Sequence, residues 1–134
     1  LAASYLAGLA MNNAGLGAVH AISHAIGGLF DTPHGHTNAL LVPPVVRRNA
    51  AESRDAFAVY ADLTGTTDAP GERLAHDLAT LRETVGLDAD LPGLPSDPDW
   101  ARVAERAVAN INMETNPVQF SRETVEAICE DVFE

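Results

Sequence analysis

The chain contains a single cysteine, Cys129, among its 134 residues. One thiol cannot form an internal disulfide, and it excludes a zinc site built from several thiolates. Aromatic residues are also scarce, at 5% of the chain, and too scattered to form a stacking platform. Any metal ion would therefore have to be held by histidine, aspartate or glutamate side chains.

Long apolar runs are absent as well. The apolar N-terminal stretch, residues 1–16, is interrupted by Ser4, Gly8 and the asparagine pair 12–13, so it predicts neither a membrane span nor a signal peptide. With 46% hydrophobic and 20% charged residues, the composition is that of a globular chain with one core. We therefore expect a single cytoplasmic domain over residues 1–134, with no membrane partner.

Lysine does not occur, and all eight basic residues are arginine, against 19 acidic residues. The resulting net charge of −11 repels phosphate backbones, which argues against nucleic acid as a partner. Two interpretations of this lysine-free acidity remain open. One is adaptation to high salt, where screening removes much of the self-repulsion; the other is a GC-rich gene that encodes arginine in place of lysine.

The spacing of apolar residues is helical almost throughout, and we expect an all-α helical bundle. No strand pattern alternates with the helices, and the Gly15-Leu-Gly17 segment lacks the third glycine of a dinucleotide-binding loop. A Rossmann-type nucleotide site is therefore excluded within this chain. The predicted helices cover residues 4–11, 15–26, 33–48, 52–63, a segment from 68 or 70 to 85, 99–110 and 121–133.

Glycine, proline and small polar residues set the predicted boundaries. The glycine pair 27–28 should end the second helix, and Thr32 should cap the third, with Pro33 at its first position. The proline pair 43–44 predicts a kink in that helix. Residues 87–98 are rich in helix breakers and predict a surface loop.

Four of the five histidines lie between positions 20 and 36. His20 and His24 are four residues apart, so a helix places both imidazoles on one face, where they can share a divalent ion. His34 follows a glycine pair that lets the chain fold back toward them. His36 should point elsewhere, and we expect His76 to be a surface residue.

A histidine pair at this spacing is more often a surface feature than a metal site, so both interpretations remain open. The apolar residues between positions 18 and 26 predict that the pair is buried, and buried imidazoles need partners or an ion. Glycines around the histidines, Gly15 among them, indicate close packing. For Asn38, four residues after His34, we favour a polar residue at a helix start over a role beside the site.

Residues 13–49 closely resemble the signature of the iron-containing (group III) alcohol dehydrogenases: NAGLGAVHAISHAIGGLFDTPHGHTNA followed by LLVPPVVRRN. Asn116, Pro117 and the helix from Ser121 resemble the closing loop and last helix of that family. Essentially the whole chain is similar to part of the family's helical C-terminal domain, which has a dehydroquinate synthase-like fold.

The resemblance implies an enzyme of two domains, in which an N-terminal α/β domain binds NAD or NADP. The helical domain holds a divalent metal, Fe²⁺ or Zn²⁺, through one aspartate and three histidines. His20 corresponds to the third ligand and His34 to the fourth. His24 corresponds to a histidine beside the metal and the nicotinamide, which implies a catalytic and cofactor-binding role in hydride transfer between an alcohol and an aldehyde. A homo-oligomer is also expected.

Two parts of the family pattern are missing from this sequence. The first two metal ligands lie in an Asp-x-x-x-His helix upstream of position 1, and the nucleotide-binding domain precedes that helix. We therefore expect an incomplete C-terminal half of a dehydrogenase, completed by the missing domain or by a partner chain. Two alternatives remain: a maleylacetate reductase, which the segment from Pro33 to Ala39 partly suits, and a truncated, non-catalytic helical interaction module.

Overall fold

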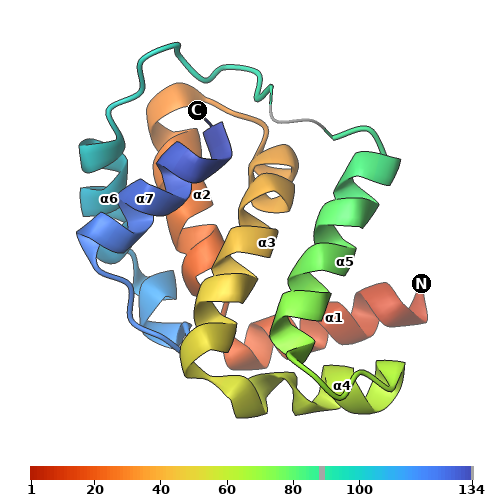
Figure 1. Cartoon of the computed structure of the whole chain (residues 1–134). Coiled ribbons are helices and arrows are strands. Elements are labelled where there is room, and N and C mark those ends of the chain that lie inside the picture. Colours follow the sequence, from red (N-terminus) through yellow and green to blue (C-terminus); the bar gives the residue numbers. More distant parts are fainter. Residues whose placement is uncertain (88–89, 134) are drawn as a thin grey trace.

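The computed structural model describes residues 1–87 and 90–133, and every regular element within them is a helix. The predicted all-α class is therefore confirmed (Figure 1). None of these helices is both long and apolar enough to cross a bilayer. The α-helices are α1 (Ala2–Ala14), α2 (Gly17–Phe30), α3 (His34–Glu52), α4 (Ala58–Thr64), α5 (Pro70–Thr84), α6 (Trp100–Val108) and α7 (Arg122–Phe133), and the short 3₁₀ helices are η1 (Arg54–Phe57) and η2 (Ile111–Thr115).

Helix α2 lies at the centre of the bundle. It packs against α3, α6 and η2, while α5 packs on the other side of α3 (Figure 1). One face of α2 carries small and branched apolar side chains that are almost completely buried. Burying each isoleucine contributes about 1.5–3 kcal/mol, and the small residues allow neighbouring helices to approach closely. This face consists of Ala18, Ala21, Ile22, Ala25 and Ile26.

Helix α2 does not end at the glycine pair 27–28, so that prediction is wrong. It continues to Phe30 and ends where Asp31 adopts a left-handed conformation, with φ of 55°. Two glycines inside a helix cost about 1 kcal/mol each. Leu29 and Phe30 pack against the core, and this contact offsets that cost.

The predicted cap of α3 is also wrong. Pro33, not Thr32, is the residue that precedes the helix, and it makes no side-chain cap. The buried Thr32 hydroxyl instead bonds the Thr37 hydroxyl at 3.0 Å, one turn into the helix. Helix α3 contains Pro43 and Pro44 and continues to Glu52, beyond its predicted end.

The other boundaries follow the predictions more closely. Helix α5 ends at Thr84, α6 follows the capping Asp99, and the Ser121 hydroxyl accepts a bond from the Thr124 amide at the start of α7. The segment predicted as one helix over 52–63 is divided into the end of α3, η1 and α4. Residues 88 and 89 of the predicted loop lie outside the described residues, and residues 90–98 are non-helical.

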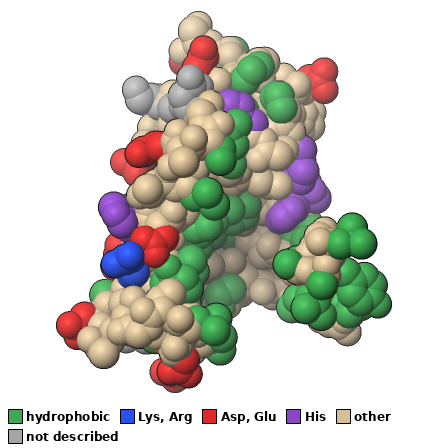
Figure 2. All heavy atoms as spheres, turned by 90° about the vertical axis from the view of Figure 1, so that its right-hand side faces the viewer, with side chains coloured by type: hydrophobic (Ala, Val, Ile, Leu, Met, Phe, Trp, Pro, Cys, Tyr) green, Lys and Arg blue, Asp and Glu red, His purple; other side chains and the backbone are tan. Residues whose placement is uncertain are grey.

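Helix α1 projects from the bundle with no buried residue. Its large apolar side chains are exposed, including Tyr5 at 68% and Leu6 at 63%. In Figure 2, hydrophobic side chains cover the projecting part at lower right, where this helix lies. An exposed apolar helix of this kind is typical of a surface that packs against another domain or another protein chain.

A buried pair of asparagines joins the start of α2 to the end of α3. The amide nitrogen of Asn116 donates to the Asn49 side-chain oxygen at 2.8 Å, and Asn49 returns a bond at 3.2 Å. The oxygen of Asn116 also accepts the Ala18 backbone N–H at 3.1 Å. This network satisfies one of the free N–H groups at the start of α2 and fixes that end of the helix.

Close backbone contact at the same place requires glycine at position 15. Gly15 has φ of 80°, and a Cβ there would lie 2.5 Å from the Thr115 hydroxyl oxygen. The Thr115 hydroxyl also accepts the Gly17 backbone N–H at 3.3 Å. The close packing predicted from the glycines is thus present here, between α2 and η2.

Replacing Asn116 by alanine should lower the free energy of unfolding by about 2–3 kcal/mol, because the Asn49 amide and the Ala18 N–H lose a buried partner. Urea denaturation of the purified protein measures this change. Asn12→Ala, on the exposed surface of α1, is the control and should stay within about 0.5 kcal/mol. Equal effects of the two substitutions would contradict the role assigned to the asparagine pair.

Candidate functional site

Three histidines from two helices lie together. His20 and His24 occupy successive turns of α2, and His34 is the first residue of α3. The ring centroids of His20 and His24 are 5.9 Å apart, and each lies 5.3 Å from that of His34. The turn at Asp31 reverses the chain and brings His34 back beside α2.

The apolar neighbours of these histidines face the core, but the histidines themselves do not. His20 is half-buried and His24 is exposed, so the predicted burial of the pair is wrong. The reason is the helical repeat: residues 18, 21, 22, 25 and 26 form the buried stripe, and positions 20 and 24 lie outside it. Of the remaining histidines, His36 is half-buried on α3 and His76 is exposed on α5.

Asn38 lies between two of the clustered imidazoles. Its amide nitrogen is 3.0 Å from Nε2 of His34 and 3.5 Å from Nε2 of His20. The favoured interpretation of Asn38 as a polar residue at a helix start is therefore wrong. It lies one helical turn after His34, so its side chain reaches the same face of α3.

Two further side chains contact the cluster and were missed from the sequence. The Ser23 hydroxyl lies 3.5 Å from Nδ1 of His34 and 3.4 Å from the carbonyl oxygen of His20. The amide nitrogen of Asn112 lies 3.3 Å from Nδ1 of His24. Asn112 belongs to η2 and is 88 residues from His24 in sequence, so no local pattern could have indicated this contact.

The surroundings of His20 favour its neutral form. Burial lowers the pKa of His20 below its usual 6.5, and the nearby His34 and His24 lower it further. The Leu16 backbone opposes this shift as the smallest of the four contributions. Within residues 1–87 and 90–133, the buried Nδ1 atom makes no hydrogen bond of normal geometry. A neutral imidazole is the form that binds a metal ion.

The donor atoms present fit part of a metal site. Nε2 of His20 and Nε2 of His34 lie 3.5 and 3.0 Å from the same atom, Nδ2 of Asn38, so the two imidazoles face one region of the surface. Imidazole nitrogen suits both iron and zinc. In the described part of the chain, no group of three histidine, cysteine, aspartate or glutamate side chains could hold an ion. A metal ion held by these histidines would therefore need ligands from outside the described residues.

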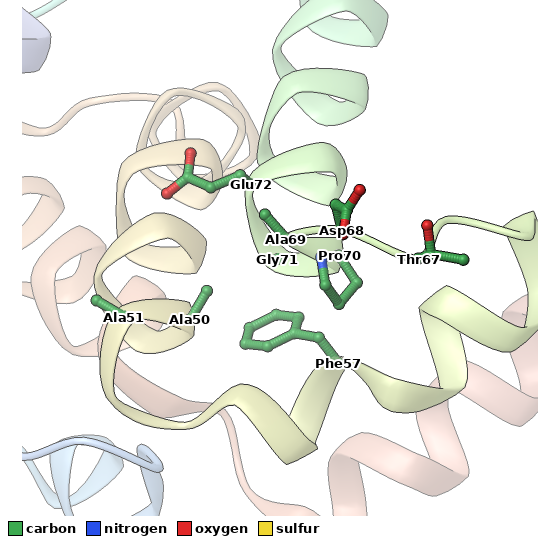
Figure 3. Close-up of a pocket in the computed structure, with 9 residues that line it drawn as sticks. All are labelled: Ala50, Ala51, Phe57, Thr67, Asp68, Ala69, Pro70, Gly71 and Glu72. Carbon is green, nitrogen blue, oxygen red and sulfur yellow. The ribbon is translucent and has the colours of Figure 1, made fainter.

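Two cavities of the described structure lie away from the histidines. A cavity of about 460 Å³ opens between the end of α3, η1 and the start of α5, with the Phe57 ring against it (Figure 3). A second, of about 390 Å³, lies between α3 and α7. Neither lining includes a histidine, so the cluster lies on an open face of this chain. The first cavity is lined by Ala50, Ala51, Phe57, Thr67, Asp68, Ala69, Pro70, Gly71 and Glu72.

The all-helical fold agrees with the comparison to known families. Residues 1–133 match the C-terminal domain of the Fe-containing alcohol dehydrogenase family. The chain therefore belongs to this family, and the resemblance seen in the sequence is confirmed.

Relatives of known function match nearly the whole chain. It is 37% identical to 1,3-propanediol dehydrogenase of Citrobacter freundii, over 98% of this chain and 36% of the relative. Alcohol dehydrogenase 4 of Saccharomyces cerevisiae is 36% identical, over 98% of this chain and 35% of the relative. The chain thus spans about a third of the length of these relatives.

Solved structures agree in fold. The crystal structure of 1,3-propanediol oxidoreductase superimposes with a TM-score of 0.86 at 35% identity, covering 98% of this chain and 36% of that one. The alcohol dehydrogenase from Oenococcus oeni gives a TM-score of 0.81 at 32% identity, covering 95% of this chain and 35% of that one.

The lowered pKa of His20 should make the metal-free protein less stable in acid. Between its folded-state pKa and about 6.5, the unfolded state binds more protons, so stability falls as the pH falls. The free energy of unfolding should therefore drop more steeply from about pH 7.5 to about pH 5.5 in the unsubstituted protein than in His20→Gln. An equal decrease in the free energy of unfolding in both proteins would contradict the lowered pKa of His20.

Proposed function

We propose that this chain supplies the metal-binding, helical part of an NAD(P)-dependent and metal-dependent alcohol dehydrogenase. His20 and His34 are two of the ligands of a divalent ion, Fe²⁺ or Zn²⁺. His24 lies beside the reacting groups and the nicotinamide. The observation that carries the proposal is the clustering of His20, His24 and His34, with ring centroids 5.3 to 5.9 Å apart, within a chain of this family.

The reaction is hydride transfer between an alcohol and an aldehyde. The alcohol loses a hydride from its carbon to the oxidised nicotinamide and the proton of its hydroxyl group to solvent, which leaves the aldehyde and NAD(P)H. A bound divalent ion supplies Lewis acidity that favours the alkoxide. His20 and His34 serve this chemistry by presenting unprotonated Nε2 atoms. His24 serves it by orienting the substrate and relaying a proton.

The rest of the enzyme is proposed to lie outside these 134 residues. The relatives are about three times as long, two imidazoles alone bind a metal weakly, and the apolar surface of α1 is uncovered. An upstream helix would add an aspartate and a histidine ligand, and an α/β domain would bind most of the nucleotide. Both come from the same longer chain or from a partner chain, and the complete enzyme is a homo-oligomer.

His20→Ala and His34→Ala, made in the complete protein, should each lower metal affinity by at least about 100-fold and remove most alcohol oxidation, because each loses a ligand. Elemental analysis after dialysis and a nicotinamide absorbance assay measure the two effects. His76→Ala, on exposed α5, is the matched control and should keep metal and activity. Full metal content in both ligand variants, or activity insensitive to a chelator, would contradict the proposal.

Simple experiments distinguish this function from two alternatives, a maleylacetate reductase and a non-catalytic interaction module. A maleylacetate reductase would reduce maleylacetate faster than simple aldehydes, with NADH or with NADPH. We expect the reverse preference. A helical interaction module without activity requires that no Asp-x-x-x-His helix and no glycine-rich nucleotide loop be encoded in frame upstream, and we expect both to be found there.

A further inference from the structure

The two asparagine amides at the histidine cluster contact different ring nitrogens. Asn38 places its amide nitrogen against Nε2 of His20 and of His34, whereas Asn112 places its amide nitrogen against Nδ1 of His24. An amide NH₂ group only donates hydrogen bonds, so the ring nitrogen that it contacts must be unprotonated. In a neutral imidazole the proton then lies on the other nitrogen.

The contacts therefore indicate opposite tautomers within one cluster. His20 and His34 carry the proton on Nδ1 and present Nε2 as a lone pair, which is the state that a metal ligand needs. His24 carries its proton on Nε2 and can donate from that atom. The Ser23 hydroxyl agrees with this assignment, because its oxygen lies 3.5 Å from Nδ1 of His34 and can accept a hydrogen bond from the N–H there.

We propose that Asn112 is a positioning residue that keeps the proton of His24 on Nε2. His24 then donates a hydrogen bond from Nε2 to the oxygen of the alcohol or aldehyde substrate. This assignment of a donor role rests on the proposed function. The three neighbouring histidines then have two different functions. His20 and His34 offer unprotonated Nε2 atoms to a metal ion, and His24 offers an N–H to the substrate.

Asn112 is itself held in place. Its backbone N–H donates to the Asn110 side-chain oxygen at 3.0 Å, and its carbonyl oxygen accepts the Thr115 hydroxyl at 3.0 Å. The helix η2 that carries it packs against α2. The backbone of Asn112 is therefore held beside α2, which places its amide against Nδ1 of His24, where it can select one tautomer.

Asn112→Asp is the substitution that should reverse the tautomer. A carboxylate only accepts hydrogen bonds, so it draws the proton of His24 to Nδ1 and leaves Nε2 unprotonated. Asn112→Ala removes the restraint without reversing it. Ile111→Asp is the matched control, since it adds the same charge to η2 at a side chain that is 70% exposed.

Magic-angle-spinning NMR of the metal-free, complete protein labelled with ¹⁵N at histidine distinguishes protonated from unprotonated ring nitrogens. Spectra are recorded at about pH 8, where an ordinary imidazole is neutral. Subtracting the spectrum of His24→Gln isolates the His24 signals. We expect protonated Nε2 in the unsubstituted protein and in Ile111→Asp, protonated Nδ1 in Asn112→Asp, and a mixture in Asn112→Ala.

The assay of the metal-loaded enzyme gives a second readout. Asn112→Asp should lower kcat for aldehyde reduction by about 10- to 100-fold, as expected when the hydrogen-bond donor to the substrate oxygen is lost, while metal content stays unchanged. A proton on Nδ1 of His24 in the unsubstituted protein overturns the inference even if the His20 and His34 variants lose their metal. If His24 responds to Asn112 while those variants keep their metal, the metal-site proposal fails and the tautomer assignment stands. Should Asn112→Asp not fold, the unsubstituted protein and Asn112→Ala decide.

Discussion

The burial of one face of α2 is the constraint on which the rest of the structure depends. Its small apolar side chains pack against α3, α6 and η2, and the same packing directs His20 and His24 away from the core. Helix α2 cannot rotate about its axis without exposing Ile22 and Ile26, which are fully buried. The position of the histidines is therefore set by hydrophobic burial and not by bonds of their own.

The ends of α2 are fixed by polar contacts that complement this packing. At its start, Asn116 accepts the Ala18 N–H and pairs with Asn49 of α3. At its end, the left-handed Asp31 reverses the chain so that His34 returns to the cluster. Together these contacts set the relative placement of α2 and α3, and the clustering of His20, His24 and His34 follows from that placement.

Much of this could be predicted from the sequence, because the relevant signals are local. The helical spacing of His20 and His24 indicated that they share a face, and apolar periodicity indicated the all-α class. The chain was expected to fold back at the glycine pair 27–28, whereas the reversal that returns His34 occurs at Asp31. Asn112 could not be found this way, since its contact depends on how η2 packs against α2. The end of α2 was misplaced for a similar reason: the tertiary packing of Leu29 and Phe30 outweighs the local effect of the glycine pair.

The proposed function of this chain depends on the binding of one metal ion by the imidazoles of His20 and His34. X-ray absorption spectroscopy of the zinc-loaded, complete protein tests this most directly. It should show imidazole nitrogens at about 2.0–2.1 Å, and the imidazole contribution should decrease in His34→Ala. A zinc shell without imidazole, or one that His34→Ala leaves unchanged, would contradict the account.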